Sequence, residues 1–69
     1  MSTQTVPLVL YREMQKAAEN IYRYDRMERF SIRQALEAGR KGQPVDAIVI
    51  RTAETALKNH QMEYQTKAA

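Results

Sequence analysis

Apolar residues recur along the first third of the chain with the period of an α-helix. Five of them follow one another at spacings of four, three, four and three: Leu10, Met14, Ala17, Ile21 and Tyr24. These spacings place the five side chains on one face of a helix. Pro7 suits the first turn, where its missing N–H costs no hydrogen bond, and Thr5 is a candidate cap. We therefore predict one long helix over residues 8–29.

A second, short helix is predicted to start after Phe30. Ser31 and Gln34 have the spacing of a capping box with Ser31 as the N-cap, and Phe30 is placed to pack on Ala35 as a hydrophobic staple. Glycine often supplies the left-handed residue that ends a helix. The chain has two glycines, and either would end this helix: Gly39 and Gly42.

A third helix is predicted from Pro44, again because proline suits the first turn of a helix. Residues that are mostly apolar or aromatic then recur on one side: Val45, Val49, Thr52, Ala53, Ala56, Leu57, His60 and Tyr64. The pattern therefore predicts an all-α fold of a long, a short and a long helix. We expect this fold to form a single helical domain over residues 7–65, between disordered tails at 1–6 and 66–69.

Two other folds fit the same pattern. No residue between 29 and 31 forbids helix, so one uninterrupted helix could span residues 7–38. The β-branched run within residues 46–50 could instead be a strand that pairs with residues 6–11, which would make the fold α+β. We carry the three-helix fold forward and keep both alternatives open.

The small size of the chain limits its stability. A domain of 69 residues buries only just over half of the surface that its unfolded chain exposes. The sequence has no cysteine, which excludes a disulfide, a thiolate zinc site and a cysteine nucleophile, and favours the cytosol. Its apolar runs are too short for a membrane span. We therefore expect oligomerisation to complete the fold.

Sequence motifs of catalysis and of cofactor binding are missing. His60 is the one histidine, and no nucleophile motif surrounds it, so we interpret it as a packing or surface residue. Residues 39–42 contain two glycines and two cations but lack the spacing of a phosphate-binding loop. We therefore expect no enzymatic activity, no catalytic residue, no cofactor and no metal site.

The third helix carries more apolar surface than two partner helices of the same chain would cover. We predict that this surplus forms a protein interface, with a second copy or with another protein: Val45, Ile48, Val49, Ile50, Ala53, Leu57 and Tyr64. The alternative is that the start of this helix is the buried centre of the three-helix fold. The favoured function is protein–protein interaction by a self-associating accessory, adaptor or inhibitor protein, of the size usual in bacteria and phages.

Cationic residues suggest a second function. The formal net charge is +3, and six cations are candidates for a face that binds an acidic protein or nucleic acid: Arg12, Lys16, Arg23, Arg26, Arg40 and Lys41. Ala35, Gly39, Val45 and Ile48 also have spacings similar to those of a helix-turn-helix, although Pro44 would lie inside its recognition helix. The alternative function is therefore a small regulator that binds nucleic acid through a degenerate helix-turn-helix.

Overall fold

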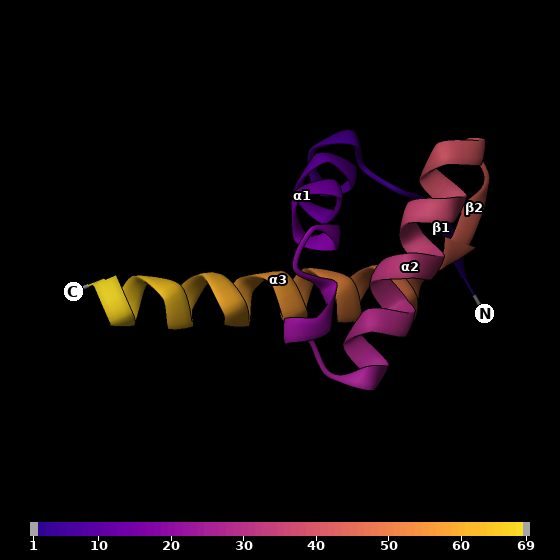
Figure 1. Cartoon of the computed structure of the whole chain (residues 1–69). Coiled ribbons are helices and arrows are strands. Elements are labelled where there is room, and N and C mark those ends of the chain that lie inside the picture. Colours follow the sequence, from indigo (N-terminus) through magenta and orange to yellow (C-terminus); the bar gives the residue numbers. More distant parts are fainter. Residues whose placement is uncertain (1, 69) are drawn as a thin grey trace.

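The computed structural model describes residues 2–68 of the 69-residue chain, and the side chains of residues 2–60. Three α-helices dominate this described part, which confirms the mostly helical fold (Figure 1). In chain order the elements are strand β1 (Thr3–Thr5), helix α1 (Leu8–Ala18), the 3₁₀ turn η1 (Ile21–Arg23), helix α2 (Arg26–Lys41), strand β2 (Pro44–Asp46) and helix α3 (Ala47–Ala68).

Helix α1 is shorter than the helix predicted over residues 8–29. It begins after Pro7, as expected, but it ends at Ala18 and is followed by η1. The apolar stripe continues through this break, because Ile21 is half-buried and Tyr24 is buried. The helical period therefore predicted which side chains are buried, and it was wrong about the continuity of the helix.

A capping box at Asp25 starts α2, and not the box predicted at Ser31. Asp25 is the N-cap, and its backbone N–H donates to Oε1 of Glu28 at 2.9 Å. Such a box satisfies N–H groups that the first turn of a helix leaves unpaired, so it favours a new start at this point. Ser31 is instead buried inside α2. The Ser31 start and the uninterrupted helix over 7–38 are both wrong.

Gly42, one of the two glycines predicted to end the helix, ends α2. Its φ of 69° is left-handed, a conformation that glycine adopts without steric cost. The N–H of Gln43 donates to the carbonyl of Ala38 at 2.9 Å, and the N–H of Gly42 donates to the carbonyl of Gly39 at 3.3 Å. These two bonds form a Schellman motif, which satisfies the last carbonyls of the helix.

Strands β1 and β2 form a small antiparallel sheet in which Gln4 lies opposite Val45. Two strands were part of the α+β alternative, but it placed them at 6–11 and 46–50. Residues 6–11 instead hold the start of α1, and 47–50 are helical. The sheet therefore lies nearer to the N-terminus than that alternative expected.

Pro44 opens β2 and does not open the third helix. Proline is tolerated at the first residue of a strand, where its missing N–H is not needed for pairing. Helix α3 begins three residues later at Ala47, because Oδ1 of Asp46 accepts a hydrogen bond from the N–H of Ile48 at 3.0 Å. The predicted start of the third helix was therefore too early.

The segments predicted as tails contain secondary structure. Within the tail predicted over 1–6, residues 3–5 form β1 and Val6 is buried. At the other end, α3 continues to Ala68 and so includes most of 66–69. No helix in the described part of the chain is long and apolar enough to cross a membrane.

The core lies where α1 and α2 pack along the N-terminal half of α3, whose C-terminal half extends past them (Figure 1). Its apolar residues come from both ends of the chain: Val6, Leu10, Met14, Ala17, Tyr24, Ile32, Ala35, Ala38, Ile50, Ala53, Ala56 and Leu57. The buried faces of α2 and α3 are rich in alanine, which lets the two helix backbones approach closely. One face of each helix is used in this way, and the other faces solvent.

Candidate interaction surface

The apolar surface predicted to bind a partner is mostly used in folding. Three of its seven residues belong to the core: Ile50, Ala53 and Leu57. Two more are half-buried against that core: Val45 and Val49. Ile48 stands apart, because 68% of its surface is exposed. The side chain of Tyr64 lies outside the described residues. The chain itself therefore covers most of this surface, and Ile48 is the described member that it leaves open.

The predicted basic face is divided by the break between α1 and α2. Its six side chains are exposed and belong to three elements: Arg12 and Lys16 to α1, Arg23 to η1, and Arg26, Arg40 and Lys41 to α2. Lys16 and Lys41 lie 3.8 and 3.1 Å from carboxylates on their own helices. Arg23 and Arg26 lie near the start of α2, whereas Arg40 lies near its other end.

Exposed apolar side chains gather at η1 and the first turns of α2. Tyr22 exposes 72% of its surface, Met27 71% and Phe30 58%. Three exposed arginines lie in the same segment: Arg23, Arg26 and Arg33. On α2, Phe30 is four residues from Arg26 and three residues from both Met27 and Arg33, and these spacings place the four residues on one solvent-facing side of that helix. We call these six residues the η1–α2 surface.

Phe30 is exposed because of where α2 begins. The opposite side of the helix is buried in the core, with Ile32 and Ala35 fully covered, so Phe30 points to solvent and does not pack as the staple predicted on Ala35. The sequence interpretation missed Phe30 as a surface residue. The signal that would have found it is the spacing of Asp25 and Glu28, which is also that of a capping box.

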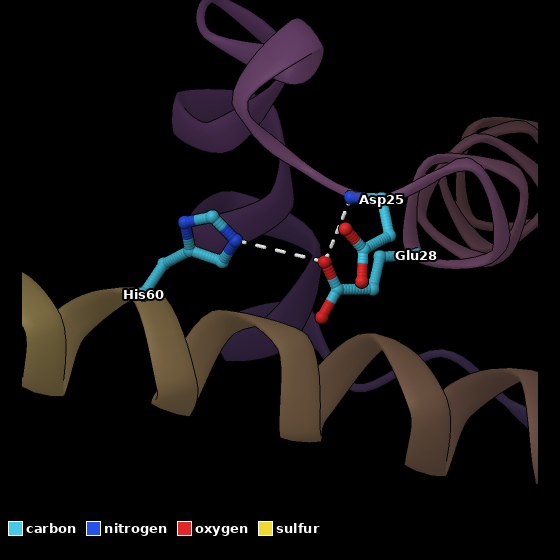
Figure 2. A network of polar contacts seen from close by, with 3 residues as sticks. All are labelled: Asp25, Glu28 and His60. Atoms are coloured by element: carbon cyan, nitrogen blue, oxygen red, sulfur yellow. Dashed lines mark hydrogen bonds and ion pairs between the residues drawn. The ribbon is translucent and has the colours of Figure 1, made fainter.

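The start of the η1–α2 surface is tied to α3 through Glu28. Its Oε1, which already accepts the N–H of Asp25, lies 3.6 Å from Nε2 of His60 (Figure 2). The ring of Tyr24 lies against the imidazole, with ring centroids 3.9 Å apart and planes tilted by 32°. Tyr24, which precedes Arg26, and Glu28, which follows Met27, therefore both contact His60 of α3.

Burial and the negative charge of Glu28 both raise the pKa of the Tyr24 hydroxyl above its usual value of 10.0. The neutral phenol is the form that this position favours. In the described part of the chain, no three His, Cys, Asp or Glu side chains gather as a metal site would require. His60 contacts one carboxylate and one ring, and both of these also hold the start of α2 in place.

The spacing that is similar to a helix-turn-helix does not form that motif. Gly39, the glycine of the pattern, lies inside α2, and Val45 lies in β2. Comparison with family models, with curated proteins and with solved structures found no match for this chain.

Proposed function

We propose that this chain is a small, cytosolic, non-enzymatic binding protein that acts through protein–protein interaction at its η1–α2 surface. One observation carries the proposal: Tyr22 in η1 and Met27 and Phe30 in the first turns of α2 are all exposed, and exposed arginines lie at nearby positions of the same segment. Aromatic residues, methionine and arginine are the residue types enriched where proteins bind one another. Exposed apolar side chains in a group mark an interaction site more often than single ones do.

The chemistry of this surface favours an acidic partner that also presents apolar groups. Arg23, Arg26 and Arg33 carry three positive charges around the apolar side chains, and arginine pairs well with carboxylates because its planar guanidinium donates two parallel hydrogen bonds. A partner with carboxylates around a shallow apolar hollow would satisfy both features. Burying Phe30 and Met27 would then contribute affinity, and the arginines would contribute orientation and association rate.

Nucleic acid is the second candidate ligand of the same surface, because arginine and tyrosine also bind phosphates and bases. Two apolar side chains of the size of Met27 and Phe30 in the first turns of α2 favour protein over nucleic acid. Reading of base edges in the major groove depends mainly on polar side chains. The two ligands also differ in salt dependence, which an experiment can use.

Affinity capture with matched variants tests the proposal. The wild type, Phe30→Ala, Arg33→Glu and Ile48→Ala would be immobilised and exposed to a lysate of the source organism. Phe30→Ala and Ile48→Ala each shorten an exposed apolar side chain, but only Phe30 belongs to the η1–α2 surface. We expect a protein that the wild type and Ile48→Ala retain and that Phe30→Ala and Arg33→Glu lose.

The captured protein would then be purified and titrated against the same variants, with duplex DNA and single-stranded RNA as competitors at low and high salt. Retention of the protein partner by Phe30→Ala would contradict the proposal. Binding of nucleic acid that falls steeply with salt concentration, and that Arg33→Glu abolishes, would favour the regulator function in its place.

A further inference from the structure

A shallow groove of about 270 Å³ lies between α1 and α3. Its lining is mostly apolar, with Val9, Leu10 and Leu57 among the lining residues. Charged side chains line it as well: Glu13, Glu54 and Lys58. Val9 exposes 75% of its surface, so the apolar lining continues onto the outside of α1. This groove is an apolar hollow with two carboxylates and one ammonium group.

The groove opens away from α2. The ring of Tyr11 on α1 packs against Gly39 of α2. Val9 and Glu13 lie on the other flank of α1, because a helix turns by about 100° per residue. The η1–α2 surface lies on the solvent side of α2 and therefore points in a different direction from the groove. One chain cannot bring its own two surfaces together.

The two surfaces are complementary in chemistry and in size. The groove presents a carboxylate excess of one around an apolar hollow, and the η1–α2 surface presents three arginines around Met27 and Phe30. At about 30 Å³ per water molecule in the liquid, the groove of about 270 Å³ holds roughly nine waters. It therefore has room for one phenyl or thioether side chain. Nζ of Lys16 lies 3.8 Å from Oε1 of Glu13. An ion pair that is exposed to solvent contributes little free energy, so the Glu13 carboxylate can still pair with an arginine.

We infer that the groove between α1 and α3 receives the η1–α2 surface of a second copy of this chain. The inference rests on the proposed function and names the partner of that surface. Because two different surfaces meet, the association is head-to-tail, and each added copy again presents a free groove and a free η1–α2 surface. Repeated association then gives short open chains or a closed ring.

Pairing of two like surfaces about a two-fold axis fits the structure less well. Two copies of the η1–α2 surface would place Arg26 and Arg33 against the same arginines, and like charges in contact oppose association. Two copies of the groove would leave the exposed Phe30 without a partner. Head-to-tail contact places the arginines near the carboxylates of the groove and places Met27 and Phe30 against its apolar lining.

Sedimentation velocity of the purified full chain over about 10 µM to about 1 mM tests this inference. We expect the mean mass of the wild type to rise above the 8.0 kDa monomer with concentration. Phe30→Ala removes the phenyl ring that would enter the groove, and Val9→Arg places a cation in the groove. Each variant alone should therefore remain monomeric. Leu8→Arg and Ile48→Ala alter exposed side chains that line neither the groove nor the η1–α2 surface, and they should associate like the wild type.

A mixture of the two monomeric variants gives the decisive result. Val9→Arg keeps an intact η1–α2 surface and Phe30→Ala keeps an intact groove, so an equal mixture should form a 1:1 dimer and nothing larger. Circular dichroism confirms that each variant is folded, and Glu54→Arg replaces Val9→Arg if the latter unfolds.

Two results would overturn the inference. One is a mixture that stays monomeric while the wild type associates, because head-to-tail contact requires the η1–α2 surface of Val9→Arg to enter the groove of Phe30→Ala. The other is a wild type that stays monomeric throughout the range. If Phe30→Ala still loses a captured acidic protein in that case, the proposed function stands without self-association, so the two proposals fail separately.

Discussion

The ring of Tyr11 occupies the space that a side chain on Gly39 would need. A Cβ built on Gly39 would lie 2.6 Å from Cδ1 of Tyr11 and 3.0 Å from Cε1. The two residues belong to α1 and α2, so this contact sets how closely the two helices approach. Gly39 does not have a positive φ, and the requirement for glycine therefore comes from packing and not from the backbone.

Gly39→Ala should lower the free energy of unfolding by about 1 kcal/mol. Alanine in a helix interior gains about 1 kcal/mol over glycine, but forcing a methyl group into a filled space costs roughly 1–3 kcal/mol. Urea denaturation of the two proteins measures the difference. The control is the same substitution in a Tyr11→Ala background, where the space is open and alanine should stabilise. Stabilisation in both backgrounds would contradict the close contact.

Glu28→Ala should lower the free energy of unfolding by roughly 1–2 kcal/mol, because it removes the reciprocal half of the capping box and the contact with His60. Glu28→Gln keeps an acceptor for the N–H of Asp25 and should cost less. Thermal and urea denaturation of both variants separate the loss of unfolding free energy due to the missing cap from the loss due to the missing charge. Equal losses in the two variants would assign the whole effect to the charge.

Glu37→Ala is the matched control for Glu28→Ala, since both residues lie on α2. A hydrogen bond from Lys41 at 3.1 Å, together with its positive charge, lowers the pKa of the Glu37 carboxylate. This pair is exposed to solvent, so its removal should cost less than removal of Glu28. A larger loss for Glu37→Ala would count against the role of Glu28.

Alkaline pH should destabilise the protein through Tyr24. The pKa of this phenol is higher in the folded state than in the unfolded chain, where it is about 10. The folded state therefore holds the proton more tightly, and its contribution to stability is complete below about pH 10 and is lost as the pH rises through the folded pKa. Unfolding free energies between about pH 8 and about pH 11 measure this loss.

Tyr24→Phe should remove this component of the pH dependence, because it has no hydroxyl to ionise. Tyr22→Phe changes an exposed tyrosine two residues away and should follow the wild-type curve. Identical curves for the wild type and Tyr24→Phe would show that burial of the phenol does not affect its ionisation.

Ile48 and Ile50 should respond differently to the same substitution. Ile50 is buried, and aspartate at this position would place a charge in the core, so Ile50→Asp should abolish folding. Ile48 is exposed, and Ile48→Asp should change the unfolding free energy by no more than about 0.5 kcal/mol. Circular dichroism and thermal melting measure both. Unfolding of Ile48→Asp would mean that another protein chain covers the Ile48 side chain and stabilises the fold.

Local pattern was enough to predict much of the fold. The spacing of Leu10, Met14 and Ala17 places these side chains on one helical face whatever the rest of the chain does, and all three are buried. The left-handed end of α2 followed from the choice between two glycines, because few other residues adopt that backbone. Helical content and helix number depend on such short-range terms, and they were predicted correctly.

Helix boundaries depended on competition between equal local signals. Asp25 with Glu28 and Ser31 with Gln34 have the same capping spacing, so the sequence alone does not choose between them. Packing makes the choice, because a helix that starts at Asp25 buries Ser31 and Ile32 against the other helices. The same choice turns Phe30 outward and so creates the η1–α2 surface.

The pairing of Gln4 with Val45 and the burial of Ile50 were decided only by the tertiary structure. A three-residue strand has no stability of its own, so its partner is selected by what the rest of the chain brings near it. Likewise, the apolar residues at the start of α3 are the same whether they face the core or a second protein. The sequence determines how much apolar surface the chain has, and the packing of α1 and α2 on α3 determines which part of it stays exposed.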